Sequence, residues 1–189
     1  MERCNEQSQN LYAESLLKRV VHERLGGPGT WADADTAIKA IARERLGPGS
    51  AALLEGVRID DGSGLSRGNT LTPTFVTAWL DSFVDDPELE EVFIESLSRG
   101  GDPDDGTLRR RFKDILVDGK RTSLPGGYRV DGKSGYINGV SCLSGYVTGP
   151  DGRRWSFSVL CNGVGHDVRG AKTLQERIVR EIALHGLSS

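Results

Sequence analysis

Three segments in the second half of the chain decide the predicted fold, and they read YRVDGKSGY (128–136), SCLSGYVT (141–148) and WSFSVLCN (155–162). Each contains β-branched and aromatic residues and is bounded by turn-forming residues, which is typical of a strand. Gly149-Pro150-Asp151-Gly152 separates the last two segments and favours a hairpin. The pattern therefore predicts consecutive antiparallel strands.

Helical patterns lie on both sides of these strands. Apolar residues recur at helical spacing, or a helix start signal occurs, in the stretches 10–25, 34–46, 72–84, 87–97, 108–116 and 173–185. Pro73 after Thr72 suits the first helical position, and Val57–Asp60 is a candidate short strand. Helices followed by antiparallel strands and a closing helix predict an α+β fold. With no internal repeat or linker, residues 1–189 are expected to form a single domain.

Composition excludes several classes of protein. The chain has 189 residues, of which 37% are hydrophobic and 27% charged, and its net charge is −3. No run approaches the ~20 apolar residues of a transmembrane segment, and the net negative charge argues against nucleic acid as a partner. Residues 1–6 contain no apolar h-region, so we expect no signal peptide within this chain.

The cysteines leave two alternatives open. Their spacing is not typical of a metal site. In an unbulged hairpin about 149–152, Cys142 and Cys161 would lie opposite each other. They would then form a disulfide, which suits an oxidising compartment, or remain two buried free thiols on one sheet face.

Two short motifs have local explanations when each is taken alone. Ser8 or Asn10 is a candidate N-cap for the helix predicted at 10–25. Lys133-Ser134-Gly135 is compatible with a turn after Gly126-Gly127.

Together with two further segments, these motifs resemble one family. The segments are Ser8-Gln9-Asn10, Asp61-Gly62-Ser63-Gly64-Leu65-Ser66-Arg67, Asp105-Gly106-Thr107-Leu108 and Lys133-Ser134-Gly135. In this order they resemble the low-molecular-mass class C penicillin-binding proteins, which are D-alanyl-D-alanine carboxypeptidases/endopeptidases. A Lys-[Ser/Thr]-Gly on a strand is one signature of such serine enzymes. The resemblance implies a partial penicillin-binding transpeptidase or serine β-lactamase-like domain, with an antiparallel sheet flanked by helices.

The resemblance also implies roles for the catalytic candidates. Ser8 would relay a proton toward the leaving D-alanine. Asn10 would donate its amide to a substrate carbonyl. Lys133 would attract the terminal carboxylate of the substrate and hold Ser8 in place.

The substrate-binding candidates follow Lys133 directly. Ser134 would hydrogen-bond the terminal carboxylate. Gly135 would leave room for a substrate lying along the strand. The backbone N–H of Tyr136 would donate to the oxyanion.

One motif of the family, a Ser-x-x-Lys well before Ser8, is missing. Ser15-Leu16-Leu17-Lys18 fits the formula, but it falls inside the first long helix, so we interpret both side chains as helix-surface groups. We therefore expect a C-terminal portion of the catalytic domain, without the nucleophile-bearing N-terminal part and the inserted domains. Alone, it would be inactive, and the edge of segment 155–162 would stay unpaired.

The leading hypothesis is a serine-type D-Ala-D-Ala carboxypeptidase/endopeptidase that acts on peptidoglycan peptides through an acyl-enzyme. The resemblance implies β-lactams as inhibitors, no cofactor or metal, and a location in the periplasm or cell envelope. The missing N-terminal segment or a complementing chain would be a partner. The alternative is a non-catalytic module on the same scaffold that binds peptidoglycan or a protein.

Overall fold

The predicted strands form three of the four strands of an antiparallel sheet in the computed structural model, which describes residues 2–104 and 106–185. They are β4 (Arg129–Ile137), β5 (Val140–Thr148) and β6 (Arg154–Asn162), each within a residue or two of its predicted range. The sheet order is β1-β4-β5-β6, and β1 comprises only Ser98–Arg99. Within the described part of the chain, β6 therefore has a neighbouring strand on one side only.

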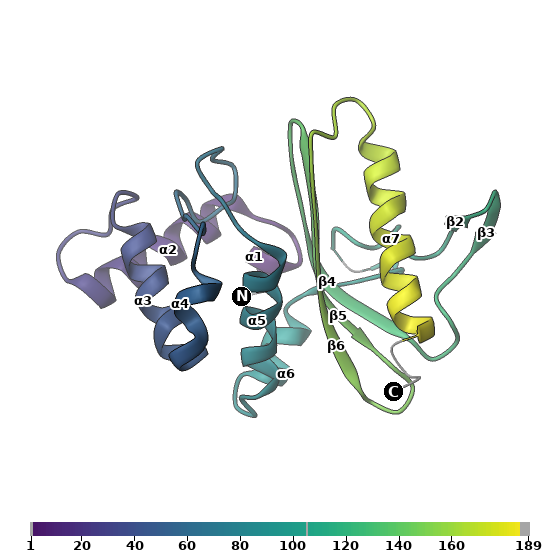
Figure 1. Ribbon diagram of the computed structural model, residues 1–189, viewed down its shortest axis with the longest axis horizontal. Helices are drawn as coiled ribbons and strands as arrows, with labels where there is room; N and C mark the ends of the chain where they lie inside the picture. The colour runs from purple at the N-terminus through teal and green to yellow at the C-terminus, as the bar shows by residue number, and fades with distance from the viewer. Residues whose placement is uncertain (1, 105, 186–189) are drawn as a thin grey trace.

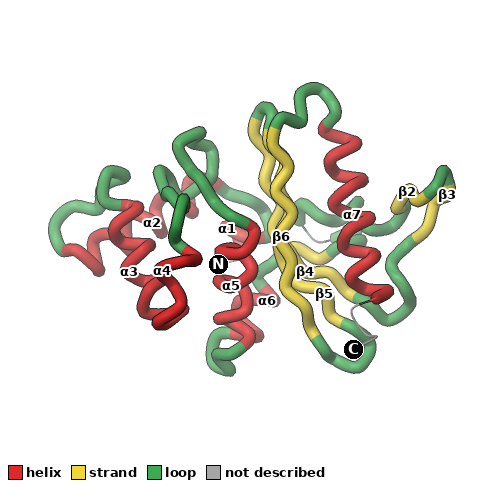
Figure 2. Tube along the Cα trace, viewed as in Figure 1, coloured by secondary structure: helices red, strands yellow, loops and turns green. Residues whose placement is uncertain are grey.

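Helices cover both faces of this sheet (Figures 1 and 2). On one face lie α5 (Pro73–Val84) and α6 (Glu90–Glu95), and on the other lies α7 (Val168–His185). Beyond α5, away from the sheet, are α3 (Ala34–Leu46) and α4 (Ser50–Leu53) (Figure 1). The remaining elements are α1 (Glu2–Asn5), α2 (Asn10–Leu25), η1 (Gly47–Gly49), β2 (Ile115–Val117) and β3 (Lys120–Thr122). The predicted α+β architecture is confirmed.

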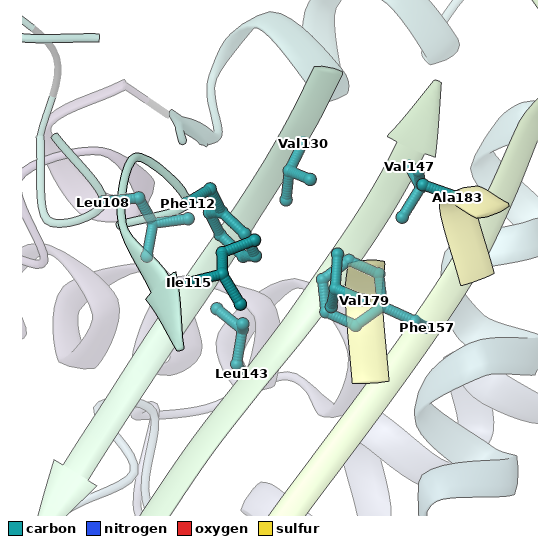
Figure 3. Close-up of a cluster of buried hydrophobic side chains, with 9 residues drawn as sticks. All are labelled: Leu108, Phe112, Ile115, Val130, Leu143, Val147, Phe157, Val179 and Ala183. Carbon is teal, nitrogen blue, oxygen red and sulfur yellow. The ribbon is translucent and has the colours of Figure 1, made fainter. Parts of the chain in front are cut away.

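The two faces of the sheet have separate cores because alternate residues of a strand point to opposite sides. The α7 face carries the larger cluster, drawn in Figure 3: Leu108, Phe112, Ile115, Val130, Leu143, Val147, Phe157, Val179 and Ala183. On the α5 face, Tyr146 is fully buried among Leu80, Ile94 and Leu97. The alternation along β5 thus sends Leu143 and Val147 to one core and Tyr146 to the other.

Local signals place several helices at their predicted bounds. The helices α2 and α3 match their predictions, and each ends before a glycine. Thr72 caps α5, because its hydroxyl accepts a hydrogen bond from the Phe75 amide at 3.1 Å. Pro73 occupies the first position of this helix, as predicted.

Other predicted elements are wrong or displaced. The helix predicted at 108–116 is absent: the chain forms turns there and enters β2, with Phe112 at φ +68°. Leu108, Phe112 and Ile115 have helical spacing, yet the turns bring all three into the α7-face core. The strand predicted at 57–60 is reduced to one bridge between Arg58 and Thr70.

The helices α6 and α7, which precede and follow the sheet strands in the sequence, differ in length from their predictions. The stretch predicted as a helix over 87–97 is helical only over α6, with turns on either side. The closing helix starts at Val168 rather than at 173. Asp105, which belongs to the Asp-Gly-Thr-Leu segment, lies outside the described residues.

The predicted pairing of the two hairpin cysteines is wrong by one residue. Strand β6 begins at Arg154, opposite Thr148, so Ser141 pairs with Cys161 and Cys142 pairs with Leu160. A one-residue slip moves a side chain to the other face of the sheet. Cys142 and Cys161 therefore lie on opposite faces, and both are free thiols of intermediate burial.

No helix in the described ranges is long and apolar enough to cross a membrane.

Candidate active site

The sequence motifs around Ser8 and Lys133 meet at the sheet. Lys133 projects from β4 on the α5 face, and its Nζ donates hydrogen bonds to Ser8 Oγ at 2.6 Å and to the Ser134 carbonyl at 2.7 Å. The two motif residues, Ser8 and Lys133, are 125 positions apart in the sequence. The fold therefore unites the two motifs that the resemblance treats as one site.

Ser8, which accepts the hydrogen bond from Lys133, has an unusual backbone conformation. Its φ is +54°, in the left-handed region that few residues other than glycine adopt. Such a conformation persists only where the surrounding structure holds it. The N-cap of α2 is Gln9, without a side-chain cap, so the explanation of Ser8 or Asn10 as an N-cap is wrong.

Lys133 is half-buried, and this changes its titration. Burial of the ammonium lowers the pKa of Lys133 below its ordinary value, and the nearby Cys4 thiol group, when ionised, opposes this shift. Desolvation disfavours the charged form of a lysine. Burial therefore disfavours the charged form of Lys133, and its ammonium donates a hydrogen bond to the Ser8 hydroxyl.

The edge of β4 beside Lys133 is open within the described residues. Strand β1 begins at Ser98, opposite Gly132, so no described strand pairs with residues 133–137 on that side. In an antiparallel sheet the backbone groups of successive residues point alternately to the two neighbouring strands. The carbonyl of Val130 accepts a hydrogen bond from Gly100 on the β1 side at 2.9 Å. By this alternation, the N–H and C=O of Ser134 and Tyr136 also face the open edge.

The side chains along this edge differ in their contacts. Ser134 Oγ donates to Thr107 Oγ1 at 3.1 Å, and the Tyr136 ring is 53% exposed. A Cβ added at Gly135 would meet only Cys142 Cβ at 3.7 Å, an ordinary contact. Packing among the described residues therefore does not require glycine at 135. The Lys-Ser-Gly segment lies inside β4, so its explanation as a turn is wrong.

Asn10 lies beside this site as the first residue of α2, and it is exposed. It follows Ser8 by only two positions in the chain. Its amide group is therefore accessible from solvent close to the contact between Ser8 and Lys133.

Three residues near the site were not among the sequence candidates. Thr107 is the hydroxyl partner of Ser134. Arg67 donates from Nη2 to the Asn138 carbonyl at 2.8 Å, which joins the Asp-Gly-Ser-Gly-Leu-Ser-Arg loop to the turn after β4. Cys4 interacts electrostatically with Lys133. The first two belong to the motif segments, but their contacts cross many residues, and the sequence contains no signal for them.

The Ser-x-x-Lys of this chain has other partners. Ser15 Oγ donates to the Leu11 carbonyl within α2 at 2.8 Å. Lys18 Nζ lies 3.7 Å from the centre of the Trp31 ring. The two side chains therefore do not form a nucleophile–base pair with each other.

Comparisons with known proteins find relatives over nearly the whole chain. The sequence model of the D-Ala-D-Ala carboxypeptidase 3 (S13) family matches residues 1–183. A D-alanyl-D-alanine carboxypeptidase of Actinomadura sp. (strain R39) is 35% identical over 179 residues, which cover 93% of this chain and 30% of that protein. Carboxypeptidase DacB of Mycolicibacterium smegmatis is 30% identical over 167 residues, covering 87% of this chain and 33% of that one.

A solved structure shows the same fold. Penicillin-binding protein 4 of Haemophilus influenzae, in complex with a β-lactam, superposes with a TM-score of 0.68 at 24% identity. The match covers 96% of this chain and 40% of that one. The fold is thus the α+β fold of penicillin-binding proteins, and the chain spans 30% to 34% of the length of the curated relatives it matches.

Proposed function

The chain belongs to the D-Ala-D-Ala carboxypeptidase 3 (S13) family, and we propose that it provides the second and third motifs of a serine acyl-transfer site. The observation that carries this proposal is the 2.6 Å hydrogen bond from Lys133 to Ser8, beside the open edge of β4. The reaction is hydrolysis of the bond between two D-alanines through an acyl-enzyme, as a carboxypeptidase or an endopeptidase. The substrates are peptidoglycan stem peptides.

Ser8 and Lys133 handle the proton in this proposal. When the acyl-enzyme forms, the leaving D-alanine amine needs a proton. The Ser8 hydroxyl donates its proton to that amine and takes up in its place the proton that leaves the nucleophile, while the Lys133 ammonium stays charged and keeps its hydrogen bond to Ser8 Oγ. The 2.6 Å hydrogen bond from Lys133 to Ser8 supports this role, because a charged donor stabilises the serine oxygen while its own proton moves to the amine.

The edge of β4 holds the substrate. A peptide that lies along residues 133–137 adds a strand to the sheet, which is a common mode of peptide recognition. Gly135 leaves this path free of a side chain. The N–H of Tyr136 donates to the oxyanion, since preorganised backbone donors stabilise the charge that develops there.

Three polar groups orient the ends of the substrate. Lys133 supplies positive charge for the terminal carboxylate, and Ser134 donates its hydroxyl to the same group after leaving Thr107. Asn10 donates its exposed amide to a substrate backbone carbonyl. Together they fix a short peptide that ends in a free carboxylate.

The nucleophile comes from a segment outside this chain in our proposal, either the N-terminal part of the same enzyme or a complementing chain. In this view residues 1–189 form one domain portion, and the unpaired side of β6 receives strands of that segment. A piece without the nucleophile is inactive, since removing one member of such a unit removes most of the catalysis. By family, the enzyme works in the periplasm or cell envelope and is inhibited by β-lactams.

A second candidate function is recognition without catalysis. Ser15 and Lys18 turn to other partners, so the Ser-x-x-Lys in α2 does not contribute to the site. The same β4 edge then binds peptidoglycan stems, or a protein, without cleaving them.

Labelling with a fluorescent penicillin separates the two. We expect the complete polypeptide, which includes the nucleophile-bearing segment, to be labelled covalently, and residues 1–189 alone to remain unlabelled. In the complete polypeptide, Lys133→Met should slow labelling by about 10²–10³-fold, whereas the control Lys39→Met on α3 should not. Absence of labelling of the folded complete polypeptide would refute the enzyme and leave the binding module, and labelling at Ser15 would refute both.

A further inference from the structure

The helix α7 packs on the sheet through two kinds of contact. Near its C-terminal end, Val179 and Ala183 enter the apolar core (Figure 3). One turn before Val179, Gln175 is fully buried at 0% exposure, and its neighbour Glu176 is largely buried. The contacts between α7 and the sheet are therefore apolar at Val179 and Ala183 and polar at Gln175, near the end of β4.

The polar contacts around Gln175 form a closed network. Its Nε2 donates to the Ser141 carbonyl at 3.0 Å and to Ser141 Oγ at 3.3 Å. Its Oε1 accepts from Arg111 Nη2 at 3.3 Å. Arg111, only 9% exposed, also donates to the Lys172 carbonyl at 3.0 Å and forms an ion pair with Glu176. Both polar ends of the Gln175 amide are therefore used inside the protein.

The two partners of the Gln175 amide, Ser141 and Arg111, each connect it to the open edge of β4. Ser141 is the partner of Tyr136 in the β4–β5 register. Arg111 lies in the same turn segment as Thr107, whose hydroxyl accepts from Ser134. Two hydrogen bonds hold the chain in place between Thr107 and Arg111. The Leu108 amide donates to Ser98 Oγ at 2.9 Å, and the Arg111 amide donates to the Leu108 carbonyl at 2.8 Å.

Stability alone is a weak explanation for this network. A buried ion pair often contributes no more than well-packed apolar residues of similar volume would. The apolar residues Val179 and Ala183 show that the same helix can pack on the same sheet without polar groups. The polar network lies on the α7 face of the sheet, next to Ser134 and Tyr136, whose backbone groups face the open edge.

We propose that Gln175 is a positioning residue for this edge: through Ser141 it holds the Tyr136 N–H, and through Arg111 and Thr107 it holds the Ser134 hydroxyl. Its role in catalysis rests on the proposed function, while its role in ordering β4 does not. Gln175 itself does not touch the substrate. It acts from the opposite face of the sheet to that of Lys133.

The first test uses residues 1–189 and needs no activity. Gln175→Met keeps the length of the side chain but removes both the donor and the acceptor, and Val179→Ala on the same helix is the matched control. We expect the ¹⁵N order parameters and amide shifts of residues 134–136 to change in Gln175→Met and to stay at wild-type values in Val179→Ala. Gln175→Glu keeps the acceptor for Arg111, so it should disturb Tyr136 more than Ser134. Unchanged signals at 134–136 in folded Gln175→Met would overturn the proposal.

The second test measures penicillin acylation of the complete polypeptide. Because a small misplacement of a catalytic group can cost up to ~10²-fold in rate, we expect Gln175→Met to slow the first-order acylation step about 10-fold or more per folded molecule. The penicillin concentration for half-maximal rate should change little, and Val179→Ala should keep the wild-type rate. An unchanged acylation rate in Gln175→Met would refute the catalytic part. If the wild type itself is not acylated, the proposed function fails, and the order parameters still decide the positioning role.

Discussion

Replacement of Lys133 by methionine should make the folded chain more stable while it destroys the site. The lysine is half-buried, and burial lowers the pKa of its ammonium. The folded environment therefore favours the neutral form, which means that the charged lysine is held at a free-energy cost at neutral pH. Methionine has a similar length and carries no charge.

The size of the effect follows from two opposing contributions. The ammonium donates two hydrogen bonds, to Ser8 Oγ and the Ser134 carbonyl, and each is worth about 1.5 kcal/mol net because the donor is charged. Burying an ion costs on the order of several kcal/mol after relaxation, and partial exposure reduces this cost. We expect a net gain of about 1 kcal/mol in the free energy of unfolding, which raises Tm by about 2–4 °C for a chain of this size.

The pH dependence gives the sharper test. Below the depressed pKa of Lys133 the folded lysine is charged and the full cost is present. As pH rises through that pKa toward the ordinary value of 10.5, the folded protein loses the proton before the unfolded chain does, so the wild type gains stability. The advantage of Lys133→Met should therefore shrink between neutral pH and about pH 10.

Thermal unfolding followed by circular dichroism at several pH values measures this difference. The control is Lys39→Met, which removes a lysine that pairs with Asp35 at 2.8 Å and should lower stability by about 0.5 kcal/mol. A Tm for Lys133→Met clearly below that of the wild type at pH 7 would contradict a net cost of the buried ammonium. So would a difference that stays constant up to about pH 10.

Three further predictions concern the fold. Thr72→Ala should lower the free energy of unfolding in urea by about 1 kcal/mol, because the cap of α5 is lost; Gln9→Ala should have no such effect, since Gln9 makes no side-chain cap. Asp131→Asn should cost about 1–3 kcal/mol in the same assay, because the carboxylate is 1% exposed and pairs with two arginines that are themselves 42% exposed; a loss below about 0.5 kcal/mol, by the measure of surface pairs, would count against it. All three cysteines should react with a thiol reagent in the unfolded chain without reductant, and a Tm that falls on adding reductant would contradict free thiols.

Local chemistry explains which elements could be predicted. The helices α2, α3 and α5 were placed correctly, since glycine stops and the Thr72-Pro73 start act within a few residues of the helix ends. The helix predicted at 108–116 failed because turns through a left-handed Phe112 bring the same apolar residues into the core. The cysteine pairing failed because the register depends on where β6 begins, and one residue reverses the face.

Some residues of the candidate site could likewise be predicted from the sequence, and others could not. The order of the motifs along the chain identified Ser8, Asn10 and Lys133 as one group of candidates, and the family match agrees with the resemblance that linked them. Thr107 and Gln175 could not be found in this manner. Their partners lie across the fold, and a hydroxyl or amide side chain carries no mark of the contact it will make.

The α+β class, the strands and the order of the motifs could be predicted from the sequence, because alternation, caps and turn residues act over short stretches of chain. Three features could be found only in the folded chain: Ser8 contacts Lys133 across 125 residues, the Tyr136 N–H faces an open edge, and Gln175 is buried on the α7 face of the sheet. These features depend on strand register and on the packing of helices against the sheet. Packing is a property of the whole chain, so no short stretch of sequence specifies it.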